Sequence, residues 1–182
     1  VNSVKDSEKP VFFIFNKIDL VILTAGAGEG YDYSIDKNEF NYYGYTPWRI
    51  NKDIHTYVSL REGIKSIGDF MFYGCEGNTY IDLPNGVTSI GDYAFSGCTS
   101  IIDMYLPNSM TSIGNQAFEG CTSMIYIDIG LGVTSIGSYA FSGCILLGSF
   151  RIPNGVTSIN DYTFASCITL RSVTLSNSIT SI

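Results

Sequence analysis

The sequence predicts an α/β repeat solenoid. In this fold a mostly β, right-handed coil carries a parallel sheet on its concave side and short helical turns on its convex side. Two observations predict it: residues of one type recur at one constant spacing through most of the chain, and each 23-residue unit contains two extended segments followed by a short turn. A unit of this length cannot bury its apolar face alone, whereas stacked copies share one core.

The repeat is defined by columns of identical or chemically similar residues. Isoleucine, phenylalanine and cysteine each keep one position in the unit, and a further position accepts any large aliphatic residue. A fixed spacing that tolerates any apolar residue is what a shared core requires. The columns are Ile67, Ile90, Ile113, Ile136, Ile159, Ile182; Phe72, Phe95, Phe118, Phe141, Phe164; Cys75, Cys98, Cys121, Cys144, Cys167; and Leu60, Leu83, Leu106, Ile129, Ile152, Leu175.

One unit illustrates the expected elements. Ile101–Leu106 alternates apolar and polar residues at its end, as a half-buried strand does, and Pro107 signals a turn after it. Met110–Ile113 is a second extended piece. Gly114–Cys121 is predicted to form one helical turn, with a small polar residue capping its start and a glycine ending it. Aspartate holds the capping position in three other units, as Asp69, Asp92 and Asp161.

Composition and charge exclude several classes of function. The chain has 182 residues, 45% of them hydrophobic, and a net charge of −7, so it has enough apolar residues for a core. Between Gly77 and Ile182 there are only two basic residues, Arg151 and Arg171, which leaves no basic stripe for nucleic acid or an anionic membrane. The longest apolar stretch, Val11–Leu23, is interrupted by polar residues and is too short for a membrane span, and no signal peptide is expected in this fragment.

Two units match a known pattern closely. LPNGVTSIGDYAFSGCTSI at Leu83–Ile101 and IPNGVTSINDYTFASCITL at Ile152–Leu170 resemble the BspA-like class of leucine-rich repeats. The resemblance implies a leucine-rich repeat solenoid over residues 54–182, with five full repeats and a truncated sixth. Because the chain stops in the middle of a unit, we expect an open, partly apolar carboxyl end that further repeats of the parent protein continue or a neighbouring molecule covers.

The region before the repeats resembles the amino-terminal segment of some bacterial family members, through Leu20–Gly28, Tyr31–Tyr33 and Thr46–Trp48. Residues 1–53 are therefore predicted to form an amino-terminal β cap, with the tyrosine-rich stretch Tyr31–Tyr45 lying over the first coil. Family members are typically surface or secreted proteins involved in adhesion to host proteins or other cells. The resemblance thus implies an extracellular or cell-surface location.

Features that could carry chemistry have simpler structural interpretations. Gly26–Gly30 lacks the spacing and the following helix of a dinucleotide loop, and a turn in the cap is preferred. Consecutive cysteines are separated by a full repeat, which predicts buried free thiols in place of a metal site. His55 is the single histidine and has no expected catalytic partner. We therefore expect no catalytic residues, no metal and no cofactor.

Outward strand positions give the candidate binding site. Where the apolar pair of each strand points inward, the residues between must point outward onto the concave sheet. This predicts a face that binds a protein or a glycan, such as host extracellular matrix or another cell surface, because tyrosine is enriched at binding hot spots. A spacer that binds nothing, in which the tyrosines only stabilise the sheet, is the alternative. The predicted residues are Tyr57, Tyr80, Asp82, Asp103, Tyr105, Tyr126, Asp128 and Arg151.

Overall fold

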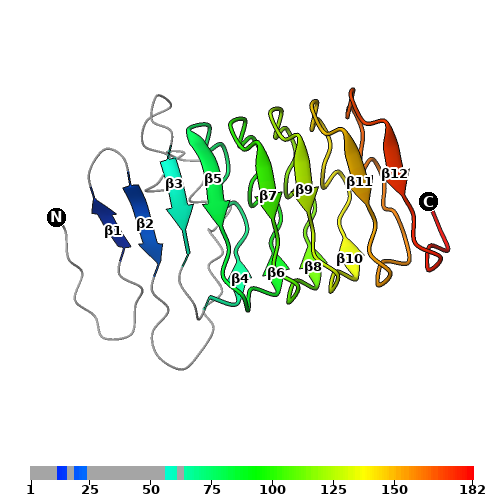
Figure 1. Cartoon of the computed structure of the whole chain (residues 1–182), viewed down its shortest axis with the longest axis horizontal. Helices are drawn as coiled ribbons and strands as arrows, with labels where there is room; N and C mark the ends of the chain where they lie inside the picture. Colours follow the sequence, from blue (N-terminus) through cyan, green and yellow to red (C-terminus); the bar gives the residue numbers. More distant parts are fainter. Residues whose placement is uncertain (1–11, 16–18, 24–55, 61–63) are drawn as a thin grey trace.

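The chain forms a parallel β-solenoid whose coils stack side by side along the long axis of the molecule (Figure 1). This computed structural model describes residues 12–15, 19–23, 56–60 and 64–182. No helix occurs among these residues, and so none of them forms a candidate membrane-spanning helix.

One face of the stack carries the longer strands, one from each coil. Parallel ladders join β3 to β5, β7 to β9 and β11 to β12, and they pair residues such as Asp103 and Tyr126 that hold the same position in consecutive coils. No ladder joins β5 to β7 or β9 to β11, so this face consists of separate short sheets. The strands are β3 (Thr56–Ser59), β5 (Asn78–Asp82), β7 (Asp103–Tyr105), β9 (Tyr126–Asp128), β11 (Ser149–Arg151) and β12 (Ser172–Thr174).

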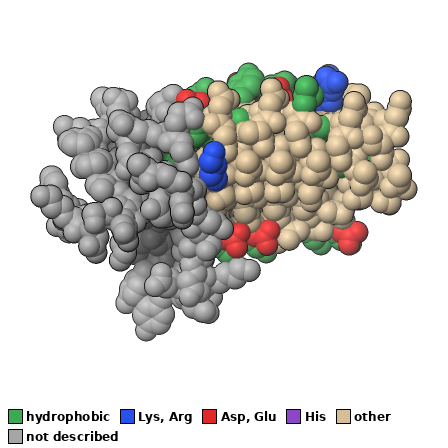
Figure 2. All heavy atoms as spheres, turned by 90° about the horizontal axis from the view of Figure 1, so that it is seen from below, with side chains coloured by type: hydrophobic (Ala, Val, Ile, Leu, Met, Phe, Trp, Pro, Cys, Tyr) green, Lys and Arg blue, Asp and Glu red, His purple; other side chains and the backbone are tan. Residues whose placement is uncertain are grey.

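A second face carries two-residue strands in one parallel sheet, β4 (Ser66–Ile67), β6 (Ser89–Ile90), β8 (Ser112–Ile113) and β10 (Ser135–Ile136). Viewed from below, this face is largely free of apolar and charged side chains (Figure 2). Threonine hydroxyls follow it from coil to coil, since Thr111 Oγ1 donates to the carbonyl of Thr88 at 2.8 Å and Thr134 Oγ1 donates to that of Thr111 at 3.2 Å.

A column of glycines allows the coils to approach closely beside the short strands. A Cβ on Gly114 would lie 2.6 Å from the carbonyl carbon of Gly91, and the amide of Gly114 donates to the carbonyl of Ile90 at 2.8 Å. The next-to-last unit breaks this column with Asn160, whose side-chain amide instead reaches the carbonyl of Ile136. The short-strand sheet ends at β10, in the coil before this residue.

The predicted helical turns are wrong. Each of these segments is a series of hydrogen-bonded turns, and residues such as Tyr93 and Gln116 adopt φ of 57° and 55°, a left-handed conformation that interrupts a helix. Backbone amides alternate between two acceptors: Phe95 N bonds to Ala117 O of the next coil, and Cys98 N bonds back to Phe95 O. In these turn segments every second backbone amide therefore bonds to the next coil, whereas in a helix all of them would bond within the segment.

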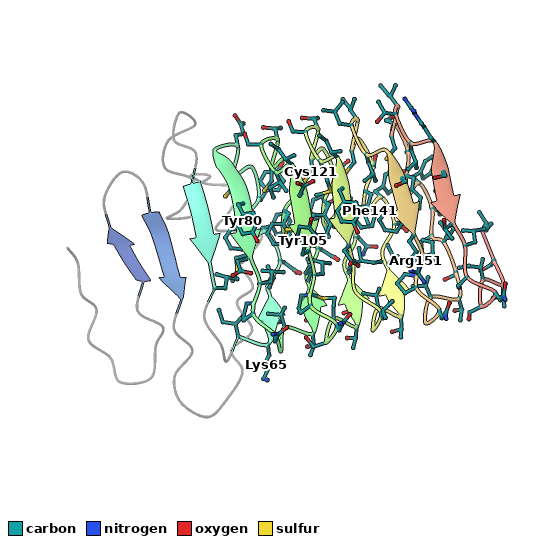
Figure 3. The ribbon with its side chains drawn as sticks, viewed as in Figure 1. Lys65, Tyr80, Tyr105, Cys121, Phe141 and Arg151 are labelled. Carbon is teal, nitrogen blue, oxygen red and sulfur yellow. The ribbon has the colours of Figure 1, made fainter. Side chains whose placement is uncertain are left out.

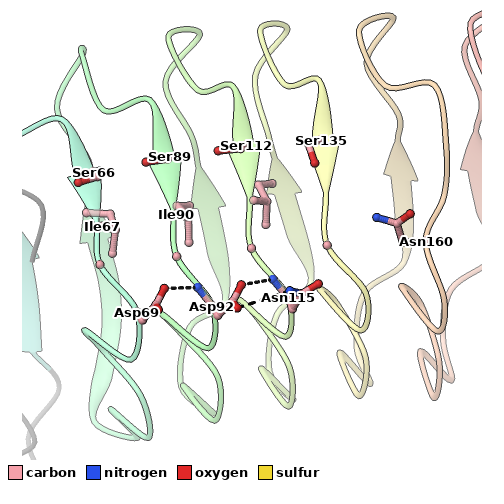
Figure 4. A pocket seen from close by; sticks show the side chains of 15 residues that line it. Ser66, Ile67, Asp69, Ser89, Ile90, Asp92, Ser112, Asn115, Ser135 and Asn160 are labelled. Carbon is pink, nitrogen blue, oxygen red and sulfur yellow. Dashed lines mark hydrogen bonds between the residues drawn. The ribbon is translucent and has the colours of Figure 1, made fainter. Parts of the chain in front are cut away.

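The predicted caps also act between coils. Asp69 Oδ1 accepts from the amide of Asp92 at 2.8 Å, and Asp92 Oδ1 accepts from the amide of Asn115 at 2.7 Å (Figure 4). Asn115 Oδ1 continues the row to the amide of Ser138 at 2.9 Å. The small polar residue at this position thus accepts a hydrogen bond from a backbone amide of the following coil. The sequence had predicted instead that it would cap the turn of its own coil.

The core lies between the faces and consists of the predicted columns. The rings of Phe72, Phe95, Phe118 and Phe141 are fully buried and stack in parallel, with centroids 5.1–5.4 Å apart. Phe150 adds a tilted ring 4.8 Å from both Phe141 and Phe164, in a strand position that other coils fill with aliphatic residues. In the last coils Ile182 is 87% exposed and Phe164 is only partly buried.

The amino-terminal strands extend the sheet that contains β3. β1 (Phe12–Phe15) pairs antiparallel with β2 (Asp19–Leu23), and β2 pairs parallel with β3 through Asp19 and Tyr57. That residues 1–53 form a cap stays a prediction. The boundary between residues 53 and 54 and the tyrosine-rich stretch Tyr31–Tyr45 lie outside the described residues.

Candidate binding face

The predicted outward residues occupy two parallel columns on the long-strand face. The tyrosine rings are exposed, by 41% at Tyr80, 56% at Tyr105 and 41% at Tyr126. Asp82 and Asp128 are exposed, and Asp103 is half-buried. We call these six residues the tyrosine-aspartate face. Of the other predicted residues, Arg151 is exposed in the next coil, whereas the side chain of Tyr57 lies outside those described.

Strand alternation directs these side chains outward. Ile81, Met104 and Ile127 stand at the centres of β5, β7 and β9, and all three are at least 95% buried in the core. Because successive side chains of a strand point to opposite faces, the flanking residues must face solvent. Figure 3 labels Tyr80 and Tyr105 in this position along neighbouring coils.

Tyrosine and aspartate alternate both along and between the columns. In the register of the repeat, Asp103 stands between Tyr80 and Tyr126 in one column, and Tyr105 stands between Asp82 and Asp128 in the other. Tyr105 also contacts Tyr126 diagonally, with ring centroids 5.7 Å apart and the planes inclined by 51°. Every carboxylate of the face therefore has an aromatic ring in an adjacent coil.

The face has a negative charge that nothing in the described structure neutralises. Asp128 Oδ1 accepts a hydrogen bond from the amide of Gly130 at 3.0 Å, and within residues 64–182 no ion pair joins Asp82, Asp103 or Asp128 to a basic side chain. Arg151 follows Asp128 in the same column and provides a positive charge beside the face. The charge order along the axis is thus three carboxylates followed by one guanidinium.

A shallow groove crosses the long-strand face where β9 and β11 are not joined by a ladder. Asp128, Gly130 and Leu131 line one side and Ser149, Arg151 and Pro153 the other, with Ser172 and Thr174 beyond. Leu131 is 69% exposed. This groove was not predicted, although the sequence carries a signal for it: Ile129-Gly-Leu replaces the Leu-Pro-Asn that follows the strands of the two preceding units.

Two further exposed groups of residues were not predicted. Tyr139 and Tyr162 stack on the turn side, with ring centroids 4.7 Å apart. Exposed aliphatic residues also gather in the last coils, where Ile145 and Leu146 occupy positions that hold Thr122 and Ser123 one coil earlier. Their signal is a departure from the chain's own repeat at positions that lie outside both the apolar columns and the outward strand positions.

The cysteines form a buried column of free thiols, as predicted, except that Cys167 is only partly buried. Burial raises the pKa of the Cys121 thiol from its ordinary value of 9.0 to about 12. Such thiols are protonated at neutral pH, and a protonated thiol is a poor nucleophile and a poor metal ligand. Among the described residues there is no group of three or more side chains that could hold a metal ion. The predicted histidine, His55, and the glycine segment Gly26–Gly30 lie outside the described residues.

Stacked parallel coils of one repeated length, with in-register apolar columns and short strands, define a leucine-rich repeat solenoid. The chain belongs to the family described as the BspA type leucine rich repeat region, which matches residues 51–148, more than half of its length. No curated protein sequence matches the chain.

Solved structures share the fold. A leucine-rich repeat protein of T. pallidum is 26% identical with a TM-score of 0.65, over 90% of this chain and 78% of that one. A leucine-rich cell surface protein of Faecalibacterium prausnitzii is 26% identical with a TM-score of 0.66, over 97% of this chain but only 43% of that one. A leucine-rich repeat protein of Bacteroides ovatus, at 22% identity and a TM-score of 0.57, over 98% of this chain and 54% of that one, shows the fold alone.

Proposed function

We propose that the chain is a non-enzymatic binding module of a cell-surface or secreted protein, and that it holds a protein or glycan partner on the tyrosine-aspartate face. The observation that carries the proposal is the exposure of Tyr80, Tyr105 and Tyr126 on the long-strand face. Large rings lose apolar contact with water when a partner covers them, and a tyrosine has few rotatable bonds to immobilise.

The similarity to a cell surface protein of F. prausnitzii supports the location, and the long-strand face supports the mode of action. The face holds phenols and carboxylates on an open surface, without an enclosed pocket that would bring an acid, a base and a nucleophile together. Residues 64–182 also contain no histidine. These features suit recognition better than catalysis.

The alternative is a spacer that has no ligand of its own. The contact between Tyr105 and Tyr126 supports this alternative, because cross-strand aromatic pairs stabilise a sheet by about 0.2–1 kcal/mol. The double variant Tyr105→Ser/Tyr126→Ser separates the two functions. A binding module loses its partner and keeps its fold, whereas a spacer loses a small amount of stability and has no binding to lose.

The test uses glycan and peptide arrays probed with the purified chain and its variants. We expect Tyr105→Ser/Tyr126→Ser to remove the signals that the parent gives while its melting temperature stays within a few degrees. The matched control is Tyr139→Ser/Tyr162→Ser, which removes a stacked tyrosine pair from the turn side and should leave the signals intact. Undiminished binding by the first variant would contradict the proposal.

A further inference from the structure

We infer that the tyrosine-aspartate face recognises an extended, arginine-rich peptide segment of its partner, with an acidic residue at the end that reaches Arg151. This inference rests on the proposed function and names the chemistry of the ligand for the same face. Its basis is the order of charges on successive coils: Asp82, Asp103 and Asp128, then Arg151.

The three carboxylates determine the sign of the ligand. No basic side chain within the described residues pairs with them, and the hydrogen bond from Gly130 N to Asp128 Oδ1 leaves most of their acceptor positions open to a ligand. A neutral sugar could donate hydroxyl hydrogen bonds to the carboxylates but would leave their negative charge without an opposite charge. A cationic ligand supplies that charge and forms charge-assisted hydrogen bonds.

The tyrosines determine the kind of cation. Each aspartate of the face lies next to a tyrosine of an adjacent coil, so a group bound to the carboxylate also meets an aromatic ring. A guanidinium is planar, bonds a carboxylate through two N–H groups and stacks on an aromatic face. An ammonium is a compact, strongly hydrated point charge and gains less from this combination. Arginine therefore fits the face better than lysine.

The spacing of the coils determines the length of the segment. Laddered strands such as β7 and β9 lie roughly 4.8 Å apart, and the two steps without a ladder are at least that wide, so the three steps from Asp82 to Arg151 span at least about 14 Å. An extended peptide rises about 3.3 Å per residue, and at least about five residues cover that distance when the peptide runs across the strands. At the Arg151 end the segment enters the groove between β9 and β11, where Leu131 offers an apolar wall.

The probe is a fluorescein-labelled octapeptide that alternates arginine with glycine and ends in glutamate. Its control is the same peptide with citrulline, a neutral isostere, in place of every arginine. We expect fluorescence polarisation to show binding of the arginine peptide alone, and binding that weakens with added salt because exposed charges are screened.

Four variants of the full chain test the residues. Asp82→Asn and Asp103→Asn should each weaken binding of the arginine peptide by about 1.5- to fivefold, the range for an exposed ion pair. Asp161→Asn removes an equal charge from the turn side and should change nothing. Arg151→Gln should weaken the binding of the peptide that ends in glutamate. It should leave unchanged the binding of a peptide that ends in glutamine.

The possible results separate the inference from the proposed function. No binding of the arginine peptide, equal affinity for the citrulline peptide, or no effect of the aspartate variants would overturn the inference. If neutral oligosaccharides bind instead, and Tyr105→Ser/Tyr126→Ser abolishes that binding, the inference is wrong and the proposed function holds. If this double variant keeps all binding, both are wrong.

Discussion

The thiol of Cys121 donates a hydrogen bond to the backbone carbonyl of Phe95 in the preceding coil, with Sγ and O 3.2 Å apart. The carbonyl of Phe95 also accepts from the amide of Cys98 at 3.1 Å. The relationship recurs along the stack, from Cys98, Cys144 and Cys167 to the carbonyls of Phe72, Phe118 and Phe141. The cysteine column therefore joins neighbouring coils through polar bonds inside an apolar core.

Replacing Cys121 tests this bond. From the sequence alone, Cys121→Ser is expected to place a hydroxyl without a partner in an apolar column. The structure supplies an acceptor in Phe95 O, so we expect Cys121→Ser to cost about 0.5–1.5 kcal/mol, below the cost of an unsatisfied hydroxyl. Cys121→Val, which has no donor, is the control for the contribution of shape. Urea unfolding followed by circular dichroism measures both, and a loss above about 3 kcal/mol for Cys121→Ser would contradict this account.

The thiols also predict a decrease in stability at alkaline pH. Burial raises the pKa of Cys98, Cys121 and Cys144, and that of Cys121 reaches about 12. Above pH 9 the unfolded chain releases thiol protons that the folded chain retains, so unfolding is favoured. We expect this contribution to be constant below about pH 8 and to be lost from pH 9 toward 12. Cys121→Ala should show a shallower decrease in the free energy of unfolding between pH 9 and 10.5, and an unchanged slope would exclude this cause.

The phenylalanine column should dominate stability. Phe118 stacks between Phe95 and Phe141 and is fully buried, so Phe118→Ala should cost about 3–5 kcal/mol. Leu131→Ala is the control, since this leucine is exposed in the groove and its loss should cost under about 0.5 kcal/mol. Thermal melts of both variants give the comparison. Similar melting temperatures would mean that the buried column has been assigned wrongly.

Glycine substitutions test the close approach of the coils. A Cβ on Gly114 would meet the backbone of Gly91 and Asp92 at 2.6 and 2.7 Å, whereas one on Gly148 meets nothing within 4 Å. Gly114→Ala should therefore destabilise the chain by about 1–3 kcal/mol through overpacking. Gly148→Ala should be neutral or slightly stabilising, because it only reduces the freedom of the unfolded chain. Equal effects of the two substitutions in urea unfolding would refute the distinction.

Columns of residues were predictable because burial repeats with the sequence. The spacing of Phe95 and Phe118 identified the core, and the alternation around Met104 placed Asp103 and Tyr105 on the outer face. Each of these inferences depends only on which side of a strand a residue occupies, and that is a local property. Most of the candidate site followed from it.

Hydrogen bonds between coils were not predictable in the same way. The turn before Cys121 has helical signals, but Phe118 N bonds to the carbonyl of Ala140 in the next coil, and Gln116 adopts a positive φ. A local pattern cannot show that an amide finds its acceptor in another coil. The groove beside Leu131 also depends on a relationship between coils, the missing ladder between β9 and β11, and the sequence marks only the departure from the repeat at this place.

The directions of these bonds differ between the two sides of each coil. On the short-strand side the amide of Gly114 donates back to Ile90, and on the turn side the amide of Phe95 donates forward to Ala117. Each contact between coils thus contains donors and acceptors from both partners, and the contacts along the short-strand sheet from β4 to β10 repeat this arrangement. Units of this regular part can therefore be duplicated or deleted while the remaining contacts keep the same form. The length of such a solenoid can therefore change in steps of one coil, independently of the residues on its long-strand face.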